Sequence, residues 1–327
     1  MNDNQNYLIN PLSVAPMMDY TDRHFRYFMR QITRHTLLYT EMIVSAAIKH
    51  GDRSKLLDFS PEEKPLSLQV GGDNPQELAE CAIIAEDWGY DEINLNVGCP
   101  SDRVQSGHFG ACLMANPELV AQCVDKMRSS VNIPVTVKHR IGIDNQDSYD
   151  NMARFVKIVS EAGCQRFTVH ARKAWLKGLS PKENRNIPPL RYEDVYHLKQ
   201  EFPHLLIEIN GGVTNLEQVE KHLEIVDAVM IGRAAYDNPY LFATVDRDIY
   251  HDNITPLTRH EIIKKMLPYI DNWVSSGYKL HSISRHLLAI FVGIPGTKAW
   301  KRYISQNAHL PGSDSQVIVE ALKNVPR

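Results

Sequence analysis

Short apolar runs alternate with longer segments of helical periodicity over most of the chain. The short runs are either apolar throughout or alternate apolar and polar residues, and both patterns indicate β-strands. Eight such runs occur: Leu12–Pro16, Leu37–Glu41, Leu66–Val70, Glu92–Leu95, Val135–Lys138, Arg166–His170, Leu205–Ile209 and Ala228–Ile231. Helices are predicted between them over Pro75–Trp88, Pro117–Val131, Tyr149–Ala162, Tyr192–Phe202 and Leu216–Ile225. Asn116–Pro117 and Asn215 stand at positions typical of helix starts.

The repeated strand–helix alternation predicts a (β/α)₈ TIM barrel, in which each parallel strand is followed by a helix. A doubly wound parallel sheet is the alternative. That fold does not need eight units, and no G-x-G-x-x-G sequence follows the first predicted strand. The barrel is therefore the favoured fold class.

The pattern changes after residue 245, where every predicted element is a helix. Helices are expected over Pro256–Gly277, Lys279–Val292, Lys298–Gln306 and Ser315–Lys323, with a shared core of Trp273, Leu280, Ile283, Leu287 and Ile290. The length of 327 residues suits a barrel with a small appendage. Two domains are therefore expected, a barrel over residues 1–245 and a small all-α domain over residues 246–327.

Charge is distributed unevenly between these two parts. The formal net charge of −3 does not by itself indicate a nucleic-acid partner. Residues 246–327, however, hold 11 Lys and Arg against 7 Asp and Glu, a net charge of +4, whereas the rest of the chain holds 25 against 32, a net charge of −7. A more basic C-terminal part is compatible with a local anion-binding surface.

The cysteines and the terminal sequence bear on the cell compartment. Five cysteines form no C-x-x-C pair, which favours reduced thiols and argues against a disulfide framework or a zinc site. The polar N-terminus has no signal-peptide core, and no apolar run approaches the roughly 18 residues that a membrane span requires. We expect a soluble cytoplasmic protein with no metal, no membrane contact and no evident obligate protein partner.

Polar and glycine residues follow the predicted strands, at the end of a TIM barrel where chemistry takes place. The residues at these positions are Pro16-Met17-Met18, Glu41, Gln69, Asn94, Asn96, Cys99, Lys138, Arg140, His170, Asn210-Gly211-Gly212 and Gly232-Arg233. Each one alone has the character of an ordinary capping or turn residue. Together they predict a functional site.

The last two strand ends have the composition of a phosphate site. Gly211, Gly212 and Gly232 allow close approach to backbone N–H groups, and Arg233 adds a positive charge. Barrels commonly bind phosphate with the loops after strands 7 and 8. A phosphorylated cofactor is therefore predicted there, with a plain tight turn as the alternative.

Two further residues have open roles on the sequence alone. Cys99 follows a strand on a short loop, where either a reactive thiol or a small buried apolar residue is common. Lys138 ends a strand, where it could stabilise negative charge on a cofactor, form a Schiff base or extend into solvent.

The stretch NLNVGCPSDRVQSGHFGACLM around Cys99 resembles the signature of the tRNA-dihydrouridine synthases, flavoenzymes that reduce uridine in transfer RNA. The resemblance runs from SVAPMMDYTDRHFR to about residue 305 and suggests the bacterial DusA branch, which acts at positions 20 and 20a of the D-loop. It implies FMN as the cofactor, NADPH or NADH as the reductant and tRNA as the substrate. It also implies that hydride passes from flavin N5 to C6 of uracil and that Cys99 donates the proton to C5.

The same resemblance implies roles for the other residues at the strand ends. FMN would be held by Pro16, Met17, Met18, Gln69, Lys138, His170, Asn210, Gly211, Gly212, Gly232 and Arg233. Asn96 would bind the uracil edge or hold its own loop, and the residues leave both roles open. A flavin barrel that acts on a free pyrimidine, like the dihydroorotate dehydrogenases, is the alternative enzyme, and an RNA-binding barrel without catalysis is the non-enzymatic alternative.

Candidate RNA contacts lie in two basic segments. The loop ARKAWLKGLSPKENRNIPPLR, residues 171–191, is long for a connection inside a barrel and mixes basic residues with Trp175, so Lys182 and Arg185 are predicted to contact tRNA. The helical domain places Lys298, Lys301 and Arg302 around Trp300, and they are predicted to do the same. A solvated basic surface is the alternative for both segments. Such a solvated face is also expected for the arginines of the first helix, Arg23, Arg26, Arg30 and Arg34.

Overall fold

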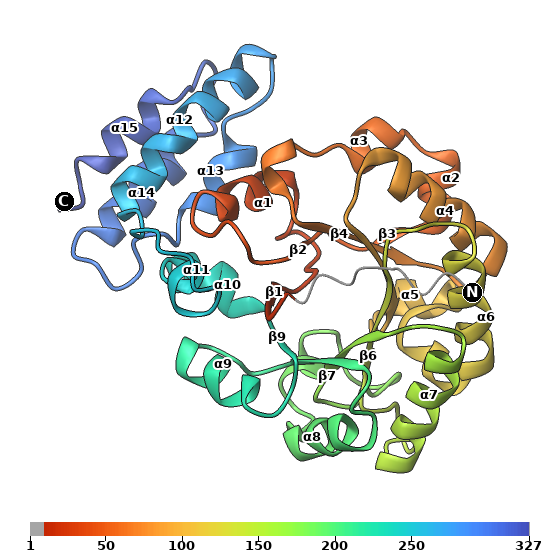
Figure 1. Ribbon diagram of the computed structural model, residues 1–327. Helices are drawn as coiled ribbons and strands as arrows, with labels where there is room; N and C mark the ends of the chain where they lie inside the picture. The colour runs from red at the N-terminus through yellow and green to blue at the C-terminus, as the bar shows by residue number, and fades with distance from the viewer. Residues whose placement is uncertain (1–9, 327) are drawn as a thin grey trace. The chain divides into compact units, whose positions relative to one another are not determined.

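A computed structural model describes residues 10–326 of the chain (Figure 1). The described residues form two compact units. The first unit consists of residues 10–18, Leu37–Phe59 and Lys64–Gly232, and the second of Asp19–Thr36, Ser60–Glu63 and residues 233–326.

The first unit is a parallel β-barrel surrounded by helices, as the alternation of elements predicts. Its strands are β1 (Leu12–Val14), β2 (Leu38–Tyr39), β3 (Ile43–Val44), β4 (Leu66–Gly71), β5 (Glu92–Val97), β6 (Val135–Arg140), β7 (Arg166–His170), β8 (Leu206–Asn210) and β9 (Ala228–Ile231). They are paired in the order β1-β9-β8-β7-β6-β5-β4-β2, and β3 also pairs with β4. A parallel bridge between Ser13 and Leu37 joins β1 to the segment before β2, so the ring is nearly closed. The TIM-barrel fold class is confirmed (Figure 1).

Helices cover the outside of this barrel and begin where capping residues stand. They are α2 (Ser45–His50), α3 (Arg53–Leu57), α4 (Pro75–Trp88), α5 (Asp102–Ser106), α6 (Pro117–Arg128), α7 (Tyr149–Glu161), α8 (Tyr192–Glu201) and α9 (Leu216–Leu223), with short 3₁₀ turns η2 (Gly110–Ala115) and η3 (Glu183–Arg185). The side chains of Asn116 and Asn215 accept hydrogen bonds from backbone N–H groups at the starts of α6 and α9, which confirms both predicted caps.

All eight predicted strands are present, but β5 and β6 each continue two residues beyond their predicted ends. The register pairs Asn96 with Lys138 and Val97 with His139, so both strands keep their ladder through polar residues. The prediction ended them early because polar side chains at a strand end resemble the start of a loop. Two-residue β3 was not predicted.

Polar side chains fill the barrel interior, which in this fold is usually packed with branched apolar residues. Glu92 on β5 is buried, and its Oε1 accepts hydrogen bonds from the hydroxyl groups of Tyr39, Ser67 and Thr136 at 2.8–3.0 Å. The apolar residues that alternate with these positions, such as Ile93, face the surrounding helices, because successive side chains on a strand point to opposite sides. The apolar layer therefore lies between the strands and the helices.

A second buried carboxylate and an arginine complete this interior cluster. Glu208 on β8 accepts hydrogen bonds from Ser13 at 2.6 Å and from Arg166 Nη2 at 2.9 Å, and it also accepts from the hydroxyl of Thr168. Arg166 Nη1 lies 4.0 Å from Glu92, so one guanidinium serves two carboxylates. Burial raises the pKa of Glu92, and Arg166 opposes that rise.

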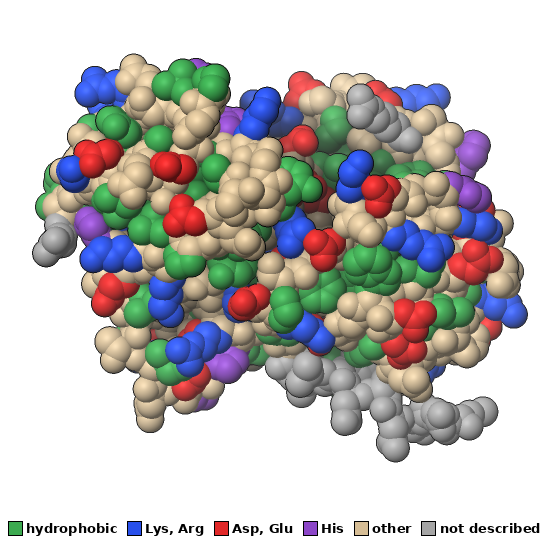
Figure 2. Space-filling model, turned by 90° about the horizontal axis from the view of Figure 1, so that it is seen from above, with side chains coloured by type: hydrophobic (Ala, Val, Ile, Leu, Met, Phe, Trp, Pro, Cys, Tyr) green, Lys and Arg blue, Asp and Glu red, His purple; other side chains and the backbone are tan. Residues whose placement is uncertain are grey.

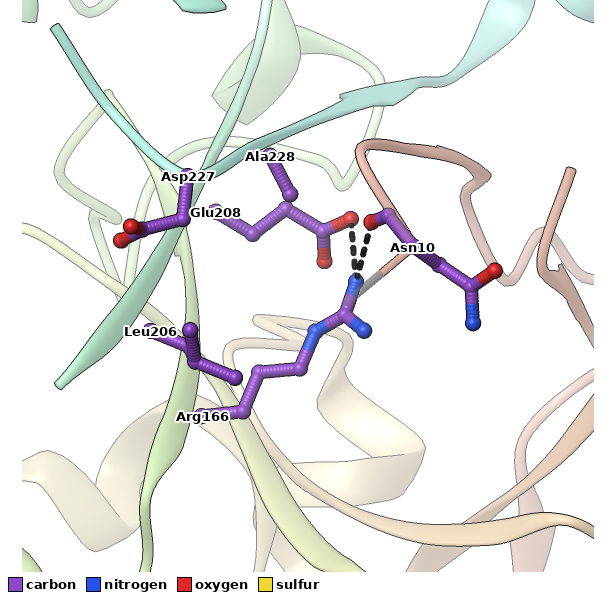
Figure 3. Close-up of a pocket in the computed structure, with 6 residues that line it drawn as sticks. All are labelled: Asn10, Arg166, Leu206, Glu208, Asp227 and Ala228. Atoms are coloured by element: carbon purple, nitrogen blue, oxygen red, sulfur yellow. Dashed lines mark hydrogen bonds and ion pairs between the residues drawn. The ribbon is translucent and has the colours of Figure 1, made fainter. Parts of the chain in front are cut away.

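A small cavity adjoins this cluster at the amino ends of the strands (Figure 3). Arg166, Glu208 and Asn10 line it, and Arg166 donates to the backbone oxygen of Asn10 at 3.4 Å. Its volume of about 10 Å³ has room for about one water and for no cofactor. This cavity therefore leaves the carboxyl end of the barrel, where the predicted site residues stand, as the candidate place for chemistry.

The second unit is helical. It contains α1 (Arg23–Arg30), α10 (Arg233–Asp237), α11 (Val245–Asp248), α12 (Arg259–Ser275), α13 (His281–Leu287), α14 (Thr297–Asn307) and α15 (Gln316–Leu322), with 3₁₀ turns η1 (Pro61–Glu63) and η4 (Pro239–Phe242). The carboxylate of Asp22 caps α1 and also contacts Arg285 and His286 of α13, which ties the two helices together. The helices predicted after residue 245 are confirmed.

Three details of this unit differ from the predictions. Arg26 is buried and paired with Glu63 at 2.7 Å, so the first helix does not present a wholly solvated arginine face. Trp273 is only partly buried and stacks on Tyr278, outside the core that the other four predicted residues form. The unit also includes α1 and begins its C-terminal part at Arg233, before the expected boundary at residue 245. The division of roles between residues 1–245 and 246–327 stays a prediction.

None of the helices within residues 10–326 has the length and apolar character needed to cross a membrane.

We expect Arg166→Met to lower the free energy of unfolding by about 3–5 kcal/mol, because it leaves two buried carboxylates without a cationic partner. Urea denaturation followed by circular dichroism measures the loss. Arg154→Met is the control, since the pair of Arg154 with Glu118 is solvent-exposed and such pairs contribute about 1 kcal/mol or less. Equal effects of the two substitutions would contradict the central role of Arg166.

Candidate functional site

The carboxyl ends of β4 to β8 bring the predicted polar residues into one region of the barrel unit. The strand register pairs Arg140 with His170 and His170 with Asn210, so these three residues form one row across β6, β7 and β8. Asn96 on β5 is paired with Lys138 on β6, two residues before Arg140 along the same strand. Residues that are far apart in sequence thus meet because parallel strands end at the same edge.

A ladder of side-chain hydrogen bonds leads from the buried carboxylate of Glu92 to the end of β5. Thr136 donates to Glu92 at 2.9 Å and accepts from Asn94 Nδ2 at 2.8 Å. Asn94 Oδ1 accepts from Gln69 Nε2 at 2.8 Å, and Gln69 Oε1 accepts from Asn96 Nδ2 at 2.8 Å. The ladder leaves the Oδ1 atom of Asn96 directed at the following loop.

Asn96 holds the loop that carries the candidate thiol. Its Oδ1 accepts from the backbone N–H of Gly98 at 3.0 Å and from that of Cys99 at 2.9 Å. Of the two roles left open for Asn96, loop-holding is thus present in the structure. A contact with substrate stays a prediction.

Cys99 is partly exposed, whereas three other cysteines are buried: Cys81, Cys123 and Cys164. Burial raises the pKa of Cys81 and of Cys123 to about 12. The Sγ atom of Cys99 lies 3.6 Å from the hydroxyl oxygen of Ser101. Cys99 is therefore not the small buried apolar residue of the alternative interpretation.

Positive charge and burial characterise the neighbouring row. Lys138 Nζ lies 3.2 Å from Asn210 Oδ1. Burial, together with the positive charge of Arg140, lowers the pKa of Lys138 to about 8. Burial and then the charges of Arg140 and Lys138 hold the pKa of His170 well below its usual value, so this imidazole is neutral at neutral pH. Such a row favours an anionic or electron-rich ligand.

Two glycines at the end of β8 have conformations suited to a phosphate cradle. Gly211 and Gly212 have φ values of +118° and +75°, where other residues are strained. A Cβ atom on Gly211 would lie 2.8 Å from the ring of His170, and one on Gly212 would lie 2.5 Å from Leu190. The register of Asn210 with Met230 places this turn beside the end of β9, where Gly232 follows.

The remaining predicted cofactor residues have varied surroundings. Pro16 and Met17 are partly buried, and Met17 packs on a small apolar cluster that includes Tyr39 and Met230. Met18 is 55% exposed. Arg233 is exposed and begins α10, the first element of the C-terminal part of the helical unit. The cofactor roles of all four stay predictions.

The basic segments are ordered, and their predicted RNA contacts stay predictions. Lys182 and Arg185 are exposed on the 171–191 loop. In the helical unit Lys298 and Arg302 are exposed, Lys301 is partly buried, and a surface groove runs beside the start of α14. Trp300 between them is fully buried and donates to the oxygen of Leu287, so it packs in the core and does not present a ring for stacking. Figure 2 shows basic and acidic side chains interspersed on the face it presents.

Sequence reasoning gave no role to two residues around the thiol, Arg140 and Gln105. Both donate hydrogen bonds to backbone oxygens beside Cys99. The signal for Arg140 was its position two residues after Lys138, which puts both side chains on the same face of a strand. Gln105 had no signal, because its role depends on a loop 71 residues away.

Among residues 10–326, no group of three or more His, Cys, Asp and Glu side chains has the arrangement of a metal site.

Comparison with known proteins identifies relatives over nearly the whole chain. The family model described as dihydrouridine synthase (Dus) matches residues 13–325. A protein of Synechocystis sp. named tRNA-dihydrouridine(20/20a) synthase is 69% identical over 316 residues, which cover 96% of this chain and 94% of the relative. Proteins of the same name from Vibrio parahaemolyticus and Escherichia coli K12 are 57% and 56% identical; the alignments cover 97% and 96% of this chain and 97% and 91% of those proteins.

The low pKa of Lys138 is directly testable. The protein is labelled with ¹³C at lysine Cε and freed of bound small molecules. The Lys138 signal should then titrate at about pH 8, whereas the signals of exposed lysines titrate at about pH 10.4. Lys138→Met identifies the signal by its loss. Arg140→Met should move the titration to higher pH, because it removes the neighbouring positive charge. A midpoint at pH 10 or above would contradict the burial of this amine.

Proposed function

Because the chain belongs to the dihydrouridine synthase family, we propose that it reduces uridine to 5,6-dihydrouridine in the D-loop of tRNA, at positions 20 and 20a. The observation that carries the proposal is the partly exposed Cys99, whose backbone N–H is held by Asn96, which in turn is paired with Lys138 on the neighbouring strand. The names of these relatives support the tRNA substrate and the modified positions. They also count against a barrel that acts on a free pyrimidine.

We infer that FMN is the cofactor and that NADPH or NADH is the reductant. The phosphate would lie on the backbone N–H groups of Gly211, Gly212 and Gly232, because the positive φ values of Gly211 and Gly212 form a turn that other residues adopt only with strain. Arg233 would add its charge to the phosphate site, and Asn210 would support the Gly211–Gly212 turn. A neutral His170 and a positively charged Lys138 suit an electron-rich ring system with carbonyl oxygens. Gln69 Nε2 donates one N–H to Asn94, and its second N–H would bind the flavin. Pro16, Met17 and Met18 would pack against the flavin ring.

When bound, FMN supplies the hydride that adds to C6 of the uracil ring. The part of the chain itself is to deliver the proton to C5, because hydride addition at C6 leaves the C5 carbon electron-rich. The thiol S–H bond of Cys99 breaks, the proton forms the new C–H bond at C5, and a thiolate remains. Lys138 and Arg140 stabilise that negative charge, since both are cations near the thiol.

The basic segments would hold the RNA. Lys182 and Arg185 on the 171–191 loop, and Lys298, Lys301 and Arg302 on α14, would neutralise backbone phosphates. We propose that residues 1–245 carry the chemistry, that residues 246–327 orient the tRNA, and that the protein acts in the cytoplasm.

Cys99→Ala should retain FMN and accept electrons from NADPH at a near-normal rate, but form dihydrouridine about 10²–10⁴-fold more slowly, because it lacks the proton donor. Stopped-flow absorbance of the flavin and mass-spectrometric mapping of dihydrouridine in tRNA measure the two steps. Cys112→Ala is the matched control, since Cys112 is also a partly exposed free thiol. Product formation at the normal rate in Cys99→Ala would refute the assignment.

A triple variant tests the proposed RNA surface. Replacing Lys298, Lys301 and Arg302 by Gln should leave flavin content and NADPH oxidation unchanged. It should raise the Kd for tRNA and flatten its dependence on salt concentration, because fewer counterions are released when fewer phosphates are neutralised. Fluorescence anisotropy over a salt series gives both quantities. Lys221→Gln is the control, an exposed lysine of the barrel unit. Unchanged affinity and salt slope would move the RNA to another surface.

A further inference from the structure

The two backbone oxygens that flank Cys99 are each held by a side chain. Arg140 Nε donates to the oxygen of Gly98 at 2.8 Å, and Gln105 Nε2 donates to the oxygen of Pro100 at 2.8 Å. Asn96 meanwhile holds the N–H of Cys99. The peptide group before Cys99 is therefore held at both its oxygen and its N–H, and the peptide group after Pro100 is held at its oxygen, by side chains from three different segments.

The same two side chains also reach the 171–191 loop. Arg140 Nη1 donates to the oxygens of Lys173 at 3.0 Å and Asn184 at 3.2 Å, and Gln105 Nε2 donates to the oxygen of Leu176 at 2.8 Å. Each side chain thus bonds to both loops at once. Arg140 is 3% exposed, so its guanidinium has little water to replace a lost partner.

Hydrogen bonds within the 171–191 loop hold its parts together. Asn184 is fully buried and makes three hydrogen bonds to backbone atoms of the loop: Oδ1 accepts from the N–H of Trp175, and Nδ2 donates to the oxygens of Trp175 and Leu179. An apolar cluster that includes Ala111 and Ala174 packs the same loop against η2, which follows the thiol loop.

We propose that Arg140 and Gln105 are positioning residues that clamp the Cys99 peptide to the 171–191 loop, so that the loop which meets the RNA also sets the place of the thiol. The inference rests on the proposed function and deepens it. A general acid must stand within hydrogen-bond reach of the atom it protonates, and a misplacement of about 1 Å costs on the order of 10²-fold in rate. The clamp makes the position of Cys99 depend on a loop whose exposed Lys182 and Arg185 face solvent.

Gln105→Met and Arg140→Lys test the clamp. Met keeps the length of Gln but has no donor, and Lys keeps the charge of Arg but cannot bond to three oxygens in the fork geometry. In single-turnover reactions of FMN-containing, pre-reduced enzyme with tRNA, we expect each variant to form dihydrouridine at least tenfold more slowly. A larger solvent deuterium isotope effect should accompany this loss, because proton delivery has become the slow step. Flavin content, the rate of reduction by NADPH and the KM for tRNA should stay within about twofold of wild type.

The control is Gln31→Met, which removes a glutamine hydrogen bond to a backbone oxygen far from these loops in sequence. Wild-type rates and isotope effects in both variants would overturn the clamp, as would a rise in KM alone with kcat unchanged. If Arg140→Lys fails to fold, Gln105→Met decides, since its side chain is only partly buried. Failure of the wild-type enzyme to form dihydrouridine would instead refute the proposed function, which separates the two outcomes.

Discussion

One buried guanidinium organises the barrel unit. Arg166 lies between Glu92 and Glu208, and without it two carboxylates would share a nearly dry interior. An ionised carboxylate only accepts hydrogen bonds, so Glu92 requires Thr136 to donate to it. Because Thr136 donates to Glu92, its oxygen accepts from Asn94, and the side-chain amides of Asn94, Gln69 and Asn96 then each donate to the preceding group of the ladder. The Oδ1 atom of Asn96, at the end of the ladder, accepts from the backbone N–H of Cys99. The orientation of the Asn96 side chain at the strand end is therefore linked to the buried carboxylate of Glu92 through hydrogen bonds.

The site combines positive charge with restricted water access in a chain whose net charge is −3. Desolvation, together with the positive charge of Arg140, lowers the pKa of Lys138 to about 8. His170 is neutral for the same reason and is available to donate or accept one hydrogen bond. A binding region of this kind responds to the charge of its ligand, whereas an exposed basic surface mainly attracts anions from a distance.

Much of the fold was predictable, because strand and helix periods are local properties of the sequence. The strand ends and the glycine pair Gly211–Gly212 also predicted that polar residues gather at the carboxyl edge of the barrel, where the strand register brings them together. The interior was not predictable, since Glu92, Arg166 and Glu208 are far apart in sequence and each looks like an ordinary surface residue. Arg140 was placed at a strand end, but its hydrogen bonds to two separate loops were not predictable, because they join residues far apart in the sequence. The burial of Trp300 was also not evident from the sequence, where it stands among basic residues on one short helix.

The polar interior also constrains how such a barrel can diverge during evolution. Apolar side chains on the helix-facing side, such as Val137 and Phe167, can exchange for others of similar volume with small losses. Inside the barrel Glu92 and Glu208 accept hydrogen bonds from several buried donors, so a single replacement leaves buried polar groups without a partner. Viable replacements there must arise in compensated sets, and sequence drift among related barrels is expected to concentrate on the outer layer while the interior changes in rare, correlated steps.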